Sequence, residues 1–201
     1  MNQGEDSDLE TVQKVQAGET DAFEVLIKRH EKMVFNLLYR MLGDYEDASE
    51  VAQEVFLSAF RSIRRFRAES SFSTWLYRIA VNQAKNRLKA VAELKRRTIP
   101  LEIADPDGDR GPISGISDPG LDPGQEAEAQ EIHDRVHREL NRLDPDDRLL
   151  ILLRDLQDVP YEEMTKILGV PLGTVKSKLH RARQALKTRL APYFYSTKVK
   201  K

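Results

Sequence analysis

Apolar residues recur at helical spacing through most of the first hundred positions. Between residues 20 and 42 they fall every three or four positions, and Gly43 ends the segment. A second segment starts after Asp44, a suitable N-cap, and ends near Ile63, and a third spans about 72–97. No stretch alternates apolar and polar residues over the length of a strand. The pattern therefore predicts three long helices and an all-α fold.

The second half of the chain shows the same periodicity in shorter elements. One helix is predicted from about 125 to 143, and the next begins at Asp144, with Pro145 in the first helical position. Two further helices meet at Gly169, which predicts a helix-turn-helix. The last helix carries a predicted buried stripe, made of Val175, Leu179, Ala182, Leu186 and Leu190.

Residues 100–124 separate the two halves. They carry repeated Asp-Pro and Pro-Gly pairs and few large apolar residues. Such a segment buries too little surface to offset its ordering entropy, so we expect a flexible acidic linker. The predicted organisation is two small helical domains over 1–98 and 126–191, the linker over 99–125, and a basic tail over 192–201.

The net charge of −1 conceals blocks of opposite sign. Residues 61–98 and residues 173–201 each carry +9, whereas residues 1–60 and 99–131 each carry −8 and residues 132–172 carry −3. Two separate basic stretches on patterned helices indicate two surfaces that face a polyanion, and they favour nucleic acid as the partner.

The composition narrows the classes of protein and of site that the chain can belong to or contain. With no cysteine, the chain has neither disulfides nor thiolate metal sites. We find no signal peptide and no apolar run long enough to span a bilayer, which predicts a cytoplasmic protein without direct membrane insertion. His133 and His137 lie four residues apart, but without further ligands we interpret them as a solvated helix face. No catalytic constellation stands out, so we expect no enzyme, metal or cofactor.

The last predicted helix presents a basic face to solvent. Recognition helices meet base edges near their start. In that part of the helix, the positions opposite the buried stripe and beside those positions are occupied by Thr174, Lys176, Ser177, His180 and Arg181. Arg183 is better placed for phosphates. A basic helix directly behind a helix-turn signal is typical of proteins that bind duplex DNA.

The other basic stretch, residues 61–98, mixes cations with aromatic and small polar residues. This mixture suits single-stranded nucleic acid, because bases stack on rings while the backbone lies along cations. Asn82 can hydrogen-bond the edge of an unstacked base. Two plainer interpretations stay open: Phe72 and Trp75 belong to the core, and Asn82 is a solvated amide.

Three long motifs resemble those of extracytoplasmic-function (ECF) sigma factors of bacterial RNA polymerase, the sigma-E-like branch of the sigma-70 family. They are Asp47-Ala-Ser-Glu-Val-Ala-Gln-Glu-Val-Phe56, then Phe66-Arg-Ala-Glu-Ser-Ser-Phe-Ser-Thr-Trp-Leu-Tyr-Arg-Ile-Ala-Val-Asn82, and Tyr161-Glu-Glu-Met followed by Gly173-Thr-Val-Lys-Ser-Lys-Leu-His-Arg-Ala-Arg183. Their order and separations are those of the family, and the resemblance covers about 8–98 and 126–190. It implies two helical domains, called sigma-2 and sigma-4, with a helix-turn-helix in the second.

The resemblance also implies a role for each motif. The residues implied to dock on the coiled coil of the polymerase β′ clamp are Asp47, Glu50, Gln53 and Glu54. Those implied to capture the melted −10 strand are Phe66, Arg67, Ser71, Phe72, Arg78, Asn82 and Lys85. Those implied to bind the −35 duplex are Thr174, Lys176, Ser177, His180, Arg181 and Arg183. The implied partners are core polymerase, through its β′ and β subunits, promoter DNA and an anti-sigma factor.

Two residues depart from the family pattern. Pro160 stands where a serine commonly caps the first helix of the motif, so we expect Asp158 to supply the cap. His180 occupies a variable base-reading position. Two other functions stay open: a helix-turn-helix regulator that is not a sigma subunit, and a polymerase-binding antagonist that never touches DNA. The helical, basic first domain argues against the former, and the basic last helix argues against the latter.

Overall fold

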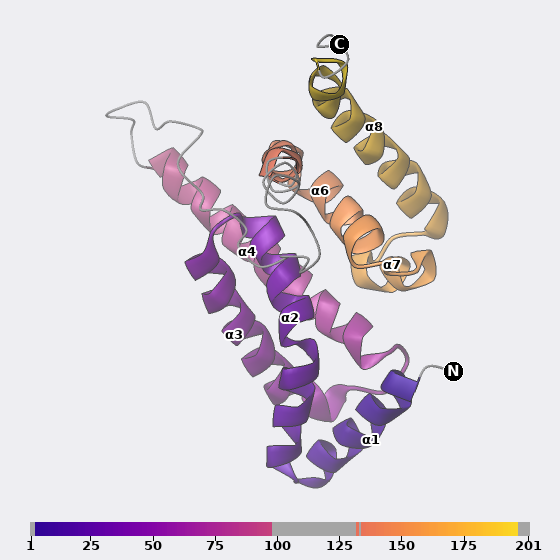
Figure 1. Ribbon diagram of the computed structural model, residues 1–201. Helices are drawn as coiled ribbons and strands as arrows, with labels where there is room; N and C mark the ends of the chain where they lie inside the picture. The colour runs from indigo at the N-terminus through magenta and orange to yellow at the C-terminus, as the bar shows by residue number, and fades with distance from the viewer. Residues whose placement is uncertain (1–2, 98–131, 133, 197–201) are drawn as a thin grey trace, which may run out of the picture.

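The computed structural model describes residues 3–97, 132 and 134–196, and within them every regular element is helical. The helices of the first domain are α1 (Gln3–Ala17), α2 (Phe23–Leu42), α3 (Tyr45–Ser62) and α4 (Phe72–Arg97), with 3-10 turns at Thr20–Ala22 and Ile63–Arg65. The second domain has a helical segment at 134–141, α6 (Pro145–Ile151), a π-helical turn at Leu152–Leu156, α7 (Tyr161–Leu168) and α8 (Leu172–Ser196). The predicted linker, residues 99–125, lies entirely outside the described residues (Figure 1).

Local signals set the helix limits of the first domain as predicted. Gly43 takes a left-handed φ of 78° and ends α2, a conformation that costs glycine little. Asp44 caps α3, since its Oδ1 accepts the backbone N–H of Asp47 at 2.8 Å. Helix α1 was not among the helices predicted from the sequence. It packs against the rest of the domain through Val12 and Val15, which are both buried.

The second domain follows the predicted caps with one exception. Asp144 caps α6 by accepting the backbone N–H of Asp146 at 2.9 Å. The expected cap of α7 by Asp158 is wrong, because that carboxylate accepts a hydrogen bond from Arg154 at 3.2 Å instead. Pro160 occupies the N-cap position itself and has no side chain that accepts a hydrogen bond.

The last helix is longer than the predicted domain. It passes through Pro192 and ends at Ser196, inside the segment assigned to the basic tail. Tyr193 anchors this extension, since its hydroxyl lies 3.1 Å from Oε1 of the buried Glu139. The extension therefore packs back onto the helical segment 134–141.

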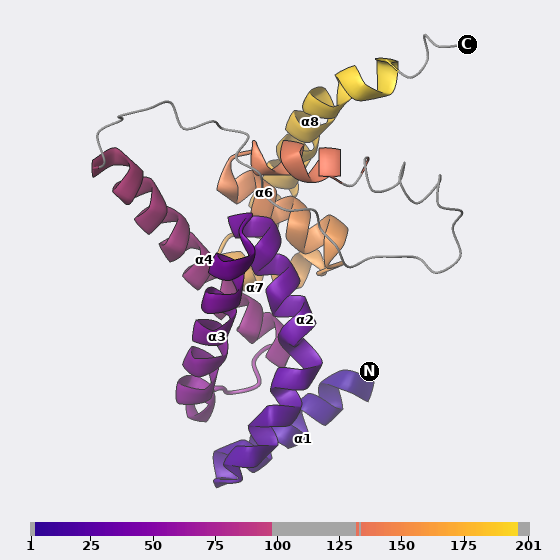
Figure 2. The same ribbon diagram turned by 60° about the vertical axis from the view of Figure 1, so that its left-hand side comes forward.

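The two domains pack against each other. Helix α7 contacts α4, and α6 contacts α2, as both views show (Figures 1 and 2). The buried apolar residues of both domains form one continuous cluster. Helix α3 lies apart from this contact and packs on α2, α4 and the turn Ile63–Arg65 among the described elements.

Candidate polymerase and nucleic-acid interfaces

The predicted docking residues lie on α3. Glu50, Gln53 and Glu54 are exposed, and Asp47 is half-buried. Arg87 of α4, which the sequence analysis did not single out, donates hydrogen bonds to Asp47 and, at 3.1 Å, to Oε2 of Glu50. The hydrogen bond and charge of Asp47 raise the pKa of Arg87 above its usual value, with a smaller contribution from Glu50. Arg87 therefore orients two of the carboxylates on this predicted docking face of α3.

An apolar groove lies beside these carboxylates, between α2 and α3. It encloses about 390 Å³ and has Ile27, Phe35, Ala52 and Phe56 among its lining residues. Gln53 lines it too and so belongs to both the groove and the polar docking face. Apolar surface next to hydrogen-bonding groups is the usual composition of a protein-binding patch.

The aromatic residues before and within α4 form a cluster rather than an exposed stacking surface. Phe66 and Phe72 are buried, and Trp75 is half-buried. The centroid of the Phe66 ring lies 6.0 Å from that of Phe72 and 5.2 Å from that of Trp75. Of the two interpretations of these rings, the structure therefore agrees with the plainer one, in which Phe72 and Trp75 pack in or against the core. Rings packed edge-to-face against one another bury more apolar area than solvated ones.

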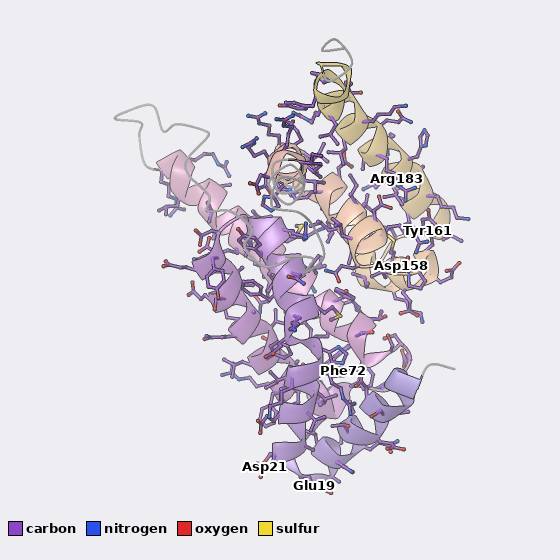
Figure 3. All side chains as sticks on the ribbon, in the orientation of Figure 1. Glu19, Asp21, Phe72, Asp158, Tyr161 and Arg183 are labelled. Atoms are coloured by element: carbon purple, nitrogen blue, oxygen red, sulfur yellow. The ribbon has the colours of Figure 1, made fainter. Side chains whose placement is uncertain are left out.

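A small pocket opens beside this cluster, at the loop that joins the turn Ile63–Arg65 to α4. It encloses about 230 Å³. Its lining residues are Leu9, Phe66, Ala68, Ser70, Ser71, Phe72, Glu163 and Lys166. Ala68 holds a left-handed φ of 55°, an unfavourable conformation for a residue with a Cβ that marks a loop held by its surroundings. Figure 3 shows Phe72 where the loop enters α4.

Helix α4 carries the remaining predicted −10 residues on its surface. Arg78 and Asn82 are exposed, four residues apart on one helical face, and Arg67 is exposed in the loop. Among the described residues, none makes a side-chain hydrogen bond to Asn82. Lys85 differs, because its ammonium group lies 2.7 Å from a carboxylate oxygen of Asp146 in α6.

Helix α7 of the second domain forms part of the pocket wall through Glu163 and Lys166. The hydroxyl of Thr74 donates a hydrogen bond to Glu163, and Lys166 Nζ lies 3.5 Å from the backbone oxygen of Glu69. Nearby, the hydroxyl of Tyr77 donates to Gln157 Oε1 at 3.1 Å. Tyr77 is buried, and this burial raises the pKa of its hydroxyl. The loop of residues 66–71, which carries predicted −10 residues, is thus in contact with α7 through Glu69.

A second contact between the two domains joins α6 to the last turn of α2. Arg148 is buried, and its guanidinium donates to the backbone oxygen of Met41 at 2.7 Å and to that of Asn141 at 2.6 Å. Met41 lies in the last turn of α2, where carbonyl groups lack helical partners and a cation is favourable. His137 is buried against the ring of Tyr39, at 5.8 Å between centroids, so the predicted solvated face is wrong for His137, and His133 lies outside the described residues.

The predicted recognition helix is the first part of α8. Val175, Leu179 and Ala182 are buried as expected. On the other side the exposed residues are Lys176, Ser177, His180 and Arg181, and Thr174 is half-buried. The Ser177 hydroxyl donates to the backbone oxygen of Thr174 at 3.1 Å.

Arg183 has an internal partner. Its Nε donates to Asp155 Oδ2 at 3.0 Å, and this hydrogen bond raises the pKa of the guanidinium. Figure 3 places Arg183 and Tyr161 on the same side of the second domain. Lys176 Nζ lies 5.8 Å from the centroid of the Tyr161 ring. Arg183 therefore braces α8 against the turn before α7, and Arg181 is the arginine that faces solvent without such a partner among the described residues.

Within the described ranges, no group of three or more His, Asp or Glu side chains has the arrangement of a metal site. In the same part of the chain, no helix is long and apolar enough to cross a membrane. The predicted site residues thus fall on three surfaces: the α3 face with Glu50 and Gln53, the pocket at Phe66 and Phe72 with the exposed face of α4, and the start of α8.

Comparison with known proteins agrees with this arrangement. The family models of Sigma-70 region 2 and Sigma-70, region 4 match residues 26–93 and 133–186. The chain is 33% identical to the RNA polymerase sigma-H factor of Pseudomonas aeruginosa, with 94% of this chain and 96% of that protein covered. It is 36% identical to the ECF RNA polymerase sigma-E factor of Haemophilus influenzae, with 92% and 96% covered.

A solved structure shares the fold. The sigma factor RpoE of Bartonella quintana, in its complex with the anti-sigma factor NepR, matches with a TM-score of 0.65 and 20% identity, over 84% of this chain and 96% of that chain. The helical order, the two matched regions and the identity over nearly the whole length lead to one assignment. The chain belongs to the ECF sigma factors of the sigma-70 family.

Proposed function

We propose that this chain directs core RNA polymerase to a specific set of promoters through the three surfaces described above. It acts in the cytoplasm as a non-catalytic subunit that recognises DNA and docks on the enzyme. The proposal rests on the presence of two separate surfaces on one chain. One is a small pocket with aromatic walls beside a basic helix, and the other is an exposed recognition helix. The first is suited to single-stranded DNA and the second to a duplex.

Docking on the polymerase is assigned to α3. Its exposed Glu50, Gln53 and Glu54 suit a basic partner such as the coiled coil of the β′ clamp, and the apolar groove beside Gln53 supplies the buried area. Arg87 keeps the Asp47 and Glu50 carboxylates in place before docking, which lowers the ordering cost of binding.

Capture of the −10 strand is assigned to the pocket and to α4. A base that leaves the stack loses a few kcal/mol, and a preformed pocket that binds it offsets part of that cost. Phe66 and Phe72 give the pocket apolar walls, and the hydroxyl of Ser71 adds a polar group. Arg78 and Asn82 lie along the exposed face of α4, where the cation meets the backbone and the amide reads a base edge.

Recognition of the −35 duplex is assigned to the start of α8. Arg181 and Lys176 are exposed there and are long enough to reach base edges or phosphates in the major groove. His180 and Ser177 lie on the same side and set the base preference with them. Arg183 serves mainly to hold α8 in place through Asp155.

We also propose control by an anti-sigma protein. The structural relative from Bartonella quintana was solved with such a partner. In this chain the loop of residues 66–71 already contacts α7, so a partner that stabilises the packed arrangement of the two domains keeps α7 against the −10 pocket. A ligand of this kind acts by favouring one of two conformations.

Run-off transcription tests the proposed function. Core polymerase is combined with this chain on a library of promoter fragments, and the RNA ends are mapped. We expect promoter-specific initiation only when both proteins are present. A helix-turn-helix regulator would instead bind DNA without core and would not confer initiation on core alone. A pure antagonist would reduce transcription by a second sigma factor without binding any fragment.

A further inference from the structure

The loop that forms the −10 pocket begins at a turn held by α1. The amide Nε2 of Gln16 donates two hydrogen bonds, to the backbone oxygen of Ile63 at 2.8 Å and to that of Phe66 at 3.0 Å. The same oxygen of Ile63 accepts the backbone N–H of Phe66 at 3.0 Å. One amide group, with its two hydrogens, therefore ties together both ends of the turn that directs Phe66 into the pocket wall.

The Phe72 side of the pocket is supported from α1 as well. The buried Asp8 of α1 lies 2.7 Å from Nε2 of His30 and 2.9 Å from Nη1 of Arg29, both on α2. The His30 ring in turn contacts the Phe72 ring, at 5.3 Å between centroids. Burial acts to raise the pKa of Asp8, but the hydrogen bonds and charges of His30 and Arg29 outweigh it and lower the pKa, so the carboxylate is an anionic anchor.

Helix α1 also reaches the pocket directly. Leu9, an exposed apolar residue at 36% of its full accessibility, is one of the residues that line the pocket. The loop between Phe66 and Phe72 contains Ala68 with its unfavourable φ of 55°. Such a backbone persists only where neighbouring groups hold it, and α1 supplies the hold at the turn and at the start of α4.

We propose that α1 is a third element of the −10 site and that Gln16 is the positioning residue that sets the Phe66 wall of the pocket. This inference rests on the proposed −10 function. Gln16 does not touch the base itself. It fixes the loop in the shape that accepts a flipped base before DNA arrives, so that the DNA does not bear the cost of ordering the loop.

The chain offers a matched control on the same helix. Gln13 is exposed, whereas Gln16 is half-buried. Gln16→Met keeps the length of the side chain and removes the donor, Gln16→Lys restores a donor, and Gln13→Met makes the same chemical change away from the loop. Each full-length variant is combined with core polymerase and assayed on a promoter library randomised at the −10 element, with permanganate footprinting of the melted strand.

For Gln16→Met we expect open-complex formation to fall about tenfold, the loss that corresponds to about 1.4 kcal/mol. The loss should concentrate at the −10 position whose base enters the pocket, with core affinity and −35 preference unchanged. Gln16→Lys should recover part of it, and Gln13→Met should behave as the unmodified chain.

Two results overturn the inference while leaving the proposed function intact. In one, Gln16→Met and Gln13→Met give the same −10 profile. In the other, Gln16→Met lowers every −10 sequence equally and in proportion to its loss of thermal stability, which is the behaviour of a purely structural residue. If the unmodified chain gives no promoter-specific transcription with core, the proposed function itself fails, and this inference fails with it.

Discussion

Glu163 of α7 accepts a hydrogen bond from Thr74 of α4, and through this contact the first helix of the helix-turn-helix forms part of the wall of the proposed −10 pocket. Lys85, one of the predicted −10 residues, is paired with Asp146 across the same boundary. The docking helix α3 and the exposed start of α8 take no part in the contact. The packed arrangement thus leaves the proposed docking and −35 surfaces accessible, and we propose that it restricts access of DNA to the −10 pocket.

This arrangement predicts that Glu163→Ala increases the affinity of the isolated chain for single-stranded −10 DNA. One hydrogen bond contributes about 0.5–1.5 kcal/mol, so we expect a gain of roughly twofold to tenfold. The measurement is fluorescence polarisation with a labelled oligonucleotide taken from a promoter that is active in run-off transcription. Glu162→Ala is the control, because Glu162 is the exposed neighbour on the same helix and its removal changes the net charge equally. Equal affinities of the two variants would show that α7 does not restrict the pocket.

The buried Arg148 predicts a stability effect that spans both domains. Arg148→Met leaves the backbone oxygens of Met41 and Asn141 without that donor, and each unsatisfied buried group costs about 1–3 kcal/mol. We expect a loss of about 2–4 kcal/mol in the free energy of unfolding, measured by urea denaturation with probes in each domain. Arg138→Met, at an exposed position, should change it little. If the first domain unfolds at an unchanged midpoint in Arg148→Met, the contact does not couple the domains.

Much of the fold follows from local signals. Asp44 and Asp144 cap helices as their sequence context predicts, and Gly43 and Gly169 end helices in left-handed conformations. These features depend on residues within a few positions of one another, so the sequence alone reveals them. The same holds for Val175, Leu179 and Ala182 of the predicted buried stripe, whereas Leu186 and Leu190, further along the helix, are only half-buried.

What the sequence did not reveal depends on distant partners. Arg148 and Met41 are 107 positions apart, and no local pattern indicates that one donates to the other. Helix α1 was missed because its buried face rests mainly on Val12 and Val15, in a segment otherwise polar and acidic. Its amphipathic spacing was the available signal, but the importance of Gln16 appears only once the turn at Ile63 lies beside it.

The docking assignment predicts that Glu50→Lys with Gln53→Lys abolishes association with core polymerase. The double change cancels the negative charge of the predicted docking residues on α3 and places a cation at the rim of the apolar groove. A pull-down with tagged core polymerase measures this association. The control is Glu10→Lys with Gln13→Lys, which makes the same substitutions at two exposed positions of α1. If both double variants bind core as the unmodified chain does, α3 is not the docking helix.

The −35 assignment gives the last prediction, because two exposed cations of α8 should behave differently. Arg181 lies near the start of the helix and can donate two hydrogen bonds to guanine, which discriminates by about 1–3 kcal/mol. Lys187 lies two turns further on and should meet only phosphates. Lys187 serves this comparison better than Arg189, whose Nη1 is 4.0 Å from a carboxylate oxygen of Glu139.

We therefore expect Arg181→Ala to change which −35 sequences are used, by roughly fivefold or more at one position. Lys187→Ala should weaken all sequences alike and reduce the salt dependence of binding, because one phosphate contact fewer releases fewer counterions. The test is a −35 library transcribed with each variant at two salt concentrations. An even loss across the library for both variants would mean that Arg181 reads no base. The start of α8 would then contribute only charge, and its placement in the major groove would be wrong.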